Sequence, residues 1–278
     1  MSNIIKADLF RILKGKALYI SILVICLISF VSIILMQQAT FGVVTTSVDS
    51  DMLNTEKVQK LAEAKNLKEY RNVIKSFGAF ELDKQIIGGN INLYYLFIAI
   101  VVIAASSDFS NGTIKNSLSS AISRRNYYFS KLILCLGLGT ALILFNNYFT
   151  HFLNLLVNGK EFASSFIEIS KITLYQMPLL WGVISLLVCM CFLFQKTALF
   201  NGIAIPFIMV IQLVVMGVGS LLRLKMDWYN KYELQSALAN LVNDPTTSYI
   251  LKCVLLGLGY IIIFNIIGYC LFRKTEVK

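Results

Sequence analysis

The residues that could do chemistry in this 278-residue chain are few, and their spacing argues against catalysis. The candidate metal ligands are one histidine and six cysteines, namely Cys26, Cys135, His151, Cys189, Cys191, Cys253 and Cys270. Cys189 and Cys191 are the closest pair, and on a helix their side chains diverge by about 200°, so they cannot bind one metal ion from the same turn. We predict no metal site, with the cysteines acting as small apolar residues and His151 as a polar tip at a membrane interface.

Acid–base chemistry also lacks its reagents. No Asp, Glu, Lys or Arg falls in the middle of a long apolar run, whereas ion-coupled carriers keep such groups at membrane depth. A metalloprotease or an acid–base hydrolase needs similar groups. The sequence contains no G-x-x-x-x-G-K-[ST] phosphate-binding loop. We therefore predict that the chain is not an enzyme, has no catalytic residues and holds no cofactor of its own.

The composition indicates which elements must carry the polar residues that remain. Hydrophobic residues make up 57% of the chain and charged residues 14%, against about 25% charged in soluble domains. The charged residues separate uncharged runs that each reach the roughly 20 residues needed to cross a bilayer. We predict an all-α membrane protein, a single transmembrane domain over 1–278, with six transmembrane helices at 17–39, 88–107, 129–157, 171–195, 197–222 and 249–272.

The distribution of Lys and Arg predicts the orientation of these spans. With six spans both termini share one side, and the segments of that side hold twelve bases. The other side holds six, once the long first loop with its seven bases and seven acids is set aside. Bases near span ends favour the cytoplasm, so both termini, the loop 108–128 and the tail 273–278 are predicted to be cytoplasmic. The net charge of +10 is then assigned to the anionic lipid bilayer and not to nucleic acid.

Residues 1–16 show the periodicity of an amphipathic helix. An apolar stripe is formed by Ile5, Leu9, Ile12 and Leu13. The bases that point elsewhere are Lys6, Arg11 and Lys14. This pattern predicts an interface helix that lies on the cytoplasmic membrane surface with its bases toward headgroups. A frayed basic tail is the alternative.

The predicted extracellular loops differ in length. Within the first, 40–87, the stretch 55–77 has no proline or glycine and shows helical spacing, which predicts one or two amphipathic helices. They form either a lid on the bundle or a partner or substrate site. The second extracellular loop is 223–248.

Several polar residues fall in or near the predicted spans. The amides are Asn146, Asn147, Gln176, Gln212 and Asn265. An unsatisfied amide is costly in a bilayer, so these side chains either join helices by hydrogen bonds or line a substrate path. Pro178 and Pro206 are expected to kink or locally break the fourth and fifth spans.

The cytoplasmic loop 108–128 has the most specific pattern in the chain. Thr113 can cap a short helix, and Ile114, Leu118 and Ile122 recur at the spacing of one helix face. Phe109 projects from the polar turn before that helix and could fill a pocket on another subunit. Arg124 and Arg125 would end the helix favourably against its dipole.

This loop resembles that of the type-2 ATP-binding-cassette exporter permeases. In that family an acid, an aromatic residue, Gly-Thr, an aliphatic residue and a base are followed about ten residues later by Ser-Arg and then Lys. The matching residues here are Asp108, Phe109, Gly112, Thr113, Ile114, Lys115, Ser123, Arg124 and Lys131. The family more often has Glu at the first position, and a proline common before the Ser-Arg pair is replaced by Ala121. The resemblance is specific only from Asp108 to Lys131.

The resemblance implies a coupling helix that docks on a nucleotide-binding ATPase subunit, which would hold ATP and Mg. The implied contact residues are Asp108, Phe109, Asn111, Gly112, Thr113, Ile114, Lys115, Arg124 and Arg125. It also implies a second permease chain, in a homodimer or heterodimer, and a multi-pass location in a bacterial plasma membrane. A chain this small resembles the permeases that export antimicrobial or bacteriocin-like peptides for immunity, antibiotic resistance or secretion.

A different class of function fits the same loop. A non-transporting membrane scaffold or sensor protein could use it to dock a cytosolic partner that is not an ATPase. Such a protein would show no ATP-dependent flux.

Overall fold

The structure, a computed structural model, describes residues 2–46, 82–89, 91–115, 122–221, 233–243 and 245–274, and every regular element in these ranges is a helix. The elements are α1 (Ser2–Lys14), α2 (Lys16–Thr46), α5 (Leu82–Gly89), α6 (Ile91–Val101), the π-helical turn η2 (Val102–Ser106), α7 (Ser107–Ser110), α9 (Arg124–Asn158), the 3₁₀ turn η3 (Lys160–Phe162), α10 (Phe166–Phe194), α11 (Thr197–Leu221), α13 (Leu234–Asn243) and α14 (Thr247–Lys274). The part of the chain that the structure describes is therefore all-α.

Five helices are long and apolar enough to cross a membrane. They cover Lys16–Leu35, Leu93–Ser110, Arg124–Asn158, Phe166–Phe194 and Thr247–Lys274. Each coincides with a predicted span, with boundaries that differ by at most five residues. The predicted fifth span forms one helix, α11, but its apolar part among the described residues is the shorter stretch Thr197–Ile208. The number of six spans stays a prediction.

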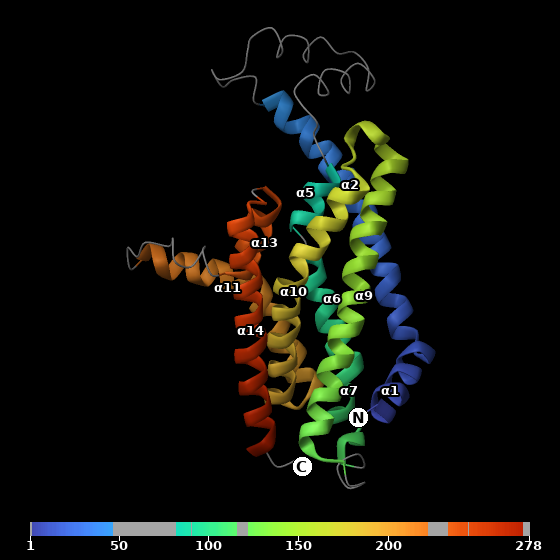
Figure 1. Cartoon of the computed structure of the whole chain (residues 1–278), viewed down its shortest axis with the longest axis vertical. Helices are drawn as coiled ribbons and strands as arrows, with labels where there is room; N and C mark the ends of the chain where they lie inside the picture. Colours follow the sequence, from blue (N-terminus) through green and yellow to red (C-terminus); the bar gives the residue numbers. More distant parts are fainter. Residues whose placement is uncertain are drawn as a thin grey trace.

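The helices form an elongated bundle with two distinct ends (Figure 1). One end, called here the terminal end, holds α1, α7, the start of α9 and the last turn of α14. The other, the distal end, holds α5, α13 and the turn between α9 and α10. Helix α11 projects sideways from the bundle (Figure 1). Residues 55–77, in the predicted first extracellular loop, lie outside the described residues.

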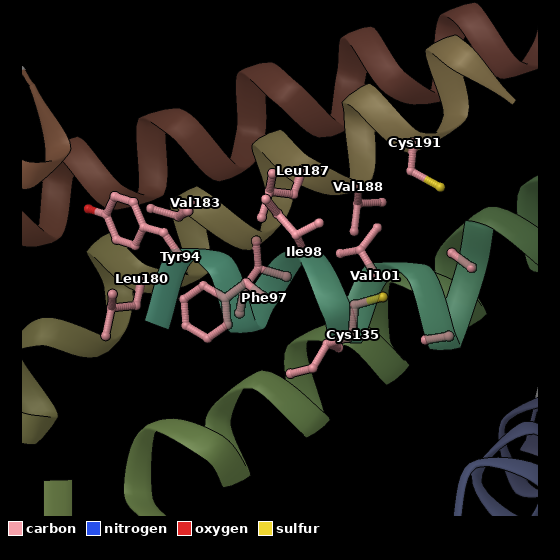
Figure 2. Close-up of a cluster of buried hydrophobic side chains, with 14 of the residues drawn as sticks. Tyr94, Phe97, Ile98, Val101, Cys135, Leu180, Val183, Leu187, Val188 and Cys191 are labelled. Atoms are coloured by element: carbon pink, nitrogen blue, oxygen red, sulfur yellow. The ribbon is translucent and has the colours of Figure 1, made fainter. Parts of the chain in front are cut away.

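The core of the bundle forms around α6. Figure 2 shows Tyr94, Phe97 and Ile98 of this helix among apolar side chains of α10 and α9. Phe97 and Val101 are fully buried. The uninterrupted apolar character of α6 suits this position, because a helix that is hydrophobic on all sides has no solvent face.

Helix α14 packs closely along α10. A Cβ atom added at Gly257 would lie 2.5 Å from the carbonyl carbon and oxygen of Pro178, so only glycine fits there. Pro178 and Pro206 lie inside α10 and α11, and neither interrupts its helix. Of the two expectations, a local break is therefore wrong, and a kink at either proline stays a prediction.

The apolar stripe predicted for the first helix is divided between two directions. Ile12 is buried in the bundle and Ile5 packs on its core, whereas Leu9 and Leu13 are exposed, together with Phe10. Helix α1 forms as expected and is separated from α2 by a bend at Gly15. Its contact with a membrane interface stays a prediction.

Candidate functional site

A buried ionic network lies at the terminal end, and we call it the terminal cluster: Asp8, Arg11, Asp108, Tyr127 and Lys131. Lys131 Nζ lies 2.6 Å from Asp8 Oδ2 and 2.5 Å from Asp108 Oδ2. Arg11 Nη1 donates to Asp108 Oδ1 at 2.7 Å, and Arg11 Nη2 lies 3.2 Å from Asp8 Oδ1. Tyr127 donates its hydroxyl to Asp108 Oδ2 at 2.9 Å. The cluster therefore joins α1, α7 and α9.

Local structure brings these groups together from distant parts of the sequence. Asp108 is the second residue of the one-turn helix α7, which follows directly on η2. Tyr127 and Lys131 are one helical turn apart near the start of α9. The Ser123 side chain caps this helix by accepting a hydrogen bond from Asn126 N at 3.2 Å. Because residues four apart share a helix face, both α9 side chains meet Asp108.

The charges of the terminal cluster balance, with two carboxylates against one guanidinium and one ammonium. The side chain of Lys131 is 1% exposed and that of Asp108 is 5% exposed. Burial alone would lower the pKa of Arg11, but the hydrogen bond that Arg11 donates to Asp108 and the charges of both carboxylates raise it above its ordinary value. Buried ion pairs add little net stability but fix geometry strongly. The cluster sets where the loop after α7 sits.

The structure buries Asp108 and half-buries Phe109. Asp108 is 3% exposed, so in this conformation its carboxylate cannot contact another subunit. The Phe109 ring packs edge-on against Phe192 of α10, with 5.4 Å between centroids. The sequence predicts a side chain that projects outward, but the ring is half-buried against Phe192 of its own chain.

The loop after α7 presents a different set of residues outward. Asn111 and Lys115 are exposed, while Ile114 is buried. Gly112 has φ of +67°, a conformation that favours glycine. Thr113 donates its hydroxyl to Asp108 O at 3.3 Å. Leu118, expected on the same face as Ile114, lies outside the described residues.

Arg124 and Arg125 begin a helix instead of ending one. Arg124 Nη1 donates to Phe272 O at 3.2 Å and to Arg273 O at 2.8 Å, so it satisfies carbonyls at the end of α14. Arg125 is exposed beside an open pocket that Phe129 and Ile133 also line. The favourable interaction of Arg124 with a helix dipole therefore occurs at the carboxyl end of α14 and not in the helix that contains Arg124.

The bases of α1 divide in the same way. Lys6 and Lys14 are exposed, and Lys14 Nζ lies 4.5 Å from the centroid of the Phe10 ring. Arg11, predicted to face headgroups, is instead held by the carboxylates of the terminal cluster. The side chain of Arg11 is nevertheless 43% exposed, so the orientation of all three bases toward headgroups stays a prediction.

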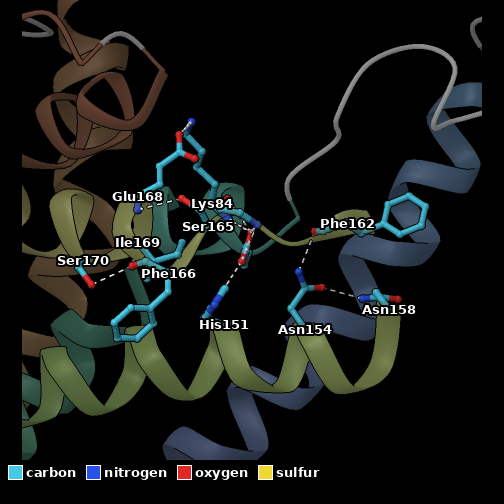
Figure 3. A network of polar contacts seen from close by, with 12 residues as sticks. Lys84, His151, Asn154, Asn158, Phe162, Ser165, Phe166, Glu168, Ile169 and Ser170 are labelled. Carbon is cyan, nitrogen blue, oxygen red and sulfur yellow. Dashed lines mark hydrogen bonds and ion pairs between the residues drawn. The ribbon is translucent and has the colours of Figure 1, made fainter. Parts of the chain in front are cut away.

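A second polar centre, the distal cluster, lies at the opposite end: Asp83, Lys84, His151, Ser164 and Glu168. Asp83 is fully buried, and its Oδ2 lies 2.6 Å from His151 Nδ1. Ser164 donates to the same carboxylate from its backbone nitrogen at 3.1 Å and from its hydroxyl at 3.0 Å. Lys84 Nζ pairs with Glu168 Oε1 at 2.7 Å. Figure 3 shows Lys84, His151 and Glu168 around this turn.

His151 therefore differs from its predicted role. It was expected as a polar tip at an interface, but it is 5% exposed and paired with Asp83. A carboxylate from α5 explains the difference, because it allows a polar ring to be buried. Nearby, Asn154 donates to Phe162 O at 2.8 Å and Asn158 donates to Asn154 at 2.8 Å (Figure 3).

The amides of the predicted spans join helices. Asn146 donates to Asn147 Oδ1 at 3.1 Å, and Asn147 donates to Thr173 at 3.1 Å. Gln176 accepts from Asn147 at 3.4 Å and donates to Ile87 O at 3.0 Å. These bonds link α9, α10 and α5, which favours the interpretation as interhelical contacts.

The remaining two amides lie elsewhere. Asn265 of α14 accepts from the Tyr128 hydroxyl at 3.0 Å and donates to Ile261 O at 2.7 Å. The side chain of Gln212 lies outside the described residues. Within the described ranges, no three His, Cys, Asp or Glu side chains converge as metal ligands would.

Sequence reasoning missed Asp8 and Tyr127 in the terminal cluster and Asp83, Lys84, Ser164 and Glu168 in the distal one. One signal was present, because Asp8 is the only acid among the first 48 residues and Asp108 the only one between residues 84 and 160. Isolated acids beside apolar spans need cationic partners. Lys131 is the buried base that both acids meet.

Comparison of the sequence with known protein families and with curated proteins found no match.

Proposed function

We propose that this chain is the permease subunit of an ATP-binding-cassette exporter, whose ATP and Mg are held by a separate ATPase subunit. The observation that supports it most is the mechanical connection of the loop 107–115. Its start is held to α1 and α9 through Asp108, and to α10 through Phe109. Its outward side carries exposed Asn111 and Lys115. A partner that pushes on this loop would therefore move three helices together.

The proposed mechanism follows from these contacts. The ATPase docks on Asn111, Gly112 and Lys115, and closure of the ATPase displaces the loop. Buried ion pairs resist separation, because breaking one leaves an uncompensated charge. The displacement of Asp108 is thus transmitted to Lys131 of α9 and Arg11 of α1, and the bundle tilts to release its cargo outward.

The proposal places the chain in a bacterial plasma membrane with both termini cytoplasmic. A second permease chain, identical or related, completes the pathway. For cargo we propose an antimicrobial or bacteriocin-like peptide, which rests on the resemblance of the loop. The exposed apolar residues Leu9, Phe10 and Leu13 of α1, with Lys6 and Lys14, suit the cytoplasmic lipid surface.

Co-purification tests the proposal. The tagged full-length chain, extracted from its native membrane in mild detergent, should retain an ATPase with a phosphate-binding loop, identified by mass spectrometry. Lys115→Glu should reduce the retained ATPase at least tenfold. Lys160→Glu is the matched control, because Lys160 is an exposed lysine at the distal end and its reversal should change nothing. Consistent retention of a non-ATPase partner instead would replace the exporter with a scaffold or sensor protein.

A further inference from the structure

The second candidate span changes its helical form just before it reaches the terminal cluster. Residues Val102–Ser106 form a π-helical turn, in which the backbone N–H of Ser107 bonds to the carbonyl of Val102 five residues earlier. A π-turn holds one residue more than the α-helical turn it replaces. Every residue from Ser107 onward is therefore rotated by about 100° from the position that an unbroken α-helix would give it.

The surroundings of this turn combine tight contact with small side chains. Helices α1, α9, α10 and α11 all contact η2. At this crossing the turn presents Ala104, Ala105 and Ser106, which are at most 1% exposed. A rotation of the backbone at these three residues displaces no bulky side chain, whereas the first two residues of the turn, Val102 and Ile103, and the neighbouring α6 carry larger apolar side chains.

Thr197, the first residue of α11, holds the turn in its present register. Its hydroxyl lies 2.9 Å from Ser106 Oγ and donates to Ser106 O at 3.0 Å. It also contacts the hydroxyl of Ser110, at the other end of α7. One threonine therefore bridges the residue before α7 and the residue that ends it.

We propose that η2 is a register switch: loss of its surplus residue would turn α7 and the loop after it by about 100° and advance them by about 1.5 Å. In the turned register each residue of α7 takes the place of the one after it. Phe109 then faces Thr197 where Ser110 stood, and Ser107 faces Lys131 where Asp108 stood. The phenylalanine ring becomes available to a partner.

The charges of the terminal cluster allow this exchange. When Asp108 leaves, Lys131 still has Asp8 at 2.6 Å and Arg11 still has Asp8 at 3.2 Å. Neither the buried Lys131 nor the half-exposed Arg11 is left without a carboxylate. Asp108, however, moves to the half-buried place beside Phe192 that Phe109 occupied, which is unfavourable for a carboxylate. The π-register is thus the resting state and the turned register must be driven.

The source of that driving force rests on the proposed function: an ATPase docked on the loop supplies it. The switch itself is a property of this chain and can be observed without the ATPase. Occasional turning in the resting chain should expose the second register at a low population.

Cysteine pairs with Thr197→Cys distinguish the two registers. Ser110→Cys reports the resting register, since these side chains are in contact. In that register, positions 109 and 111 each point about 100° around the axis of α7 away from the direction of Thr197. Phe109→Cys and Asn111→Cys therefore form a matched comparison. Only Phe109→Cys comes to face Thr197 when α7 turns. The pairs are oxidised in isolated membranes that contain the full-length chain, and mass spectrometry identifies each bond separately from those of the native cysteines.

We expect the Ser110→Cys pair to cross-link fastest and the Phe109→Cys pair at least tenfold faster than the Asn111→Cys pair. Equal rates for Phe109→Cys and Asn111→Cys would overturn the switch. Deletion of Ala104 removes the surplus residue and leaves α7 in its resting orientation. In that background the Ser110→Cys pair should still cross-link, and the Phe109→Cys pair should cross-link only as fast as the Asn111→Cys pair. A Phe109→Cys rate that stays higher would also overturn the switch.

The two proposals fail separately. If ATPase co-purifies and ATP leaves the Phe109→Cys rate equal to that of Asn111→Cys, the switch is wrong and the exporter stands. If no ATPase co-purifies while Phe109→Cys still cross-links faster, the exporter is wrong and the switch stands. If the deletion abolishes all cross-links because the chain does not fold, the comparison of Phe109→Cys with Asn111→Cys in the intact chain still decides the result.

Discussion

The terminal and distal clusters use similar side chains in different arrangements. At the distal end the Asp83 carboxylate is surrounded by His151, both donors of Ser164 and the backbone of Lys84. At the terminal end each cation instead has two carboxylates within reach, because Lys131 and Arg11 both contact Asp8 and Asp108.

This difference separates a cluster with fixed hydrogen-bond partners from one whose ion pairs can change. A carboxylate with every acceptor site occupied has one favourable arrangement, so the distal cluster holds α5 to the turn between α9 and α10. Shared cations keep a partner when one carboxylate leaves. The terminal cluster can therefore change while its buried charges remain paired, which is what a moving contact requires.

The largest expected effect is that of Lys131→Met. It leaves the Asp8 and Asp108 carboxylates with the half-exposed Arg11 as their remaining shared cation, and removal of one partner from a buried pair costs about 3–5 kcal/mol. Thermal unfolding of the purified chain in detergent measures this loss. Lys171→Met, at an exposed lysine, is the control; equal losses for the two variants would show that the terminal cluster is not a buried ionic centre.

Asp83→Asn tests the fixed hydrogen-bond partners of the distal cluster. The amide keeps the shape but loses the charge that faces His151 and Ser164, and hydrogen bonds to charged groups contribute about 1.5–3 kcal/mol. The midpoint of unfolding should fall accordingly, while the amount of co-purified ATPase should not change. A selective loss of the ATPase with normal stability would remove the distinction between the two clusters.

Gln176→Leu sharpens the role of the amides near the distal cluster. The variant loses the bonds to Asn147 and Ile87 O, and hydrogen bonds between membrane helices contribute about 0.6–1.7 kcal/mol. Unfolding measurements should show a loss of that size with export intact. Unchanged stability together with abolished export would instead assign Gln176 to a substrate path.

Arg11→Gln should have the smallest effect on stability. Its side chain is 43% exposed, and ion pairs that solvent reaches contribute about 1 kcal/mol or less. We expect a loss within that limit in the same unfolding assay, because Lys131 continues to neutralise both carboxylates. A loss as large as that of Lys131→Met would mean that Arg11, and not Lys131, holds the cluster together.

The sequence predicted the long helices well because their signal is local. Uncharged runs of about 20 residues leave few alternatives to a membrane helix, and five of them reappear with small shifts at their ends. The clusters depend on contacts that no local pattern contains. Lys131 and Asp8 are separated by 123 positions, and the direction in which Asp108 points is set by the single surplus residue of η2.

The placement of Phe109 shows the same limit. Its position after a polar turn predicted an outward knob, but the direction of a side chain on a one-turn helix depends on the register inherited from the helix before it. The π-turn sends this ring toward Phe192 and Asp108 toward Lys131. Predictions that rest on the family resemblance, including the partner and the cargo, concern contacts between chains and stay predictions.

Site-specific photo-cross-linking tests the central claim most directly, namely that the exposed loop beside the terminal cluster is where an ATPase acts. A photoreactive amino acid replaces Lys115 in one strain and Lys160 in another, and both are irradiated in native membranes. We expect position 115 to capture an ATPase with a phosphate-binding loop and position 160 to capture none. Capture of lipid alone at position 115, or capture of the ATPase at position 160 instead, would contradict the claim.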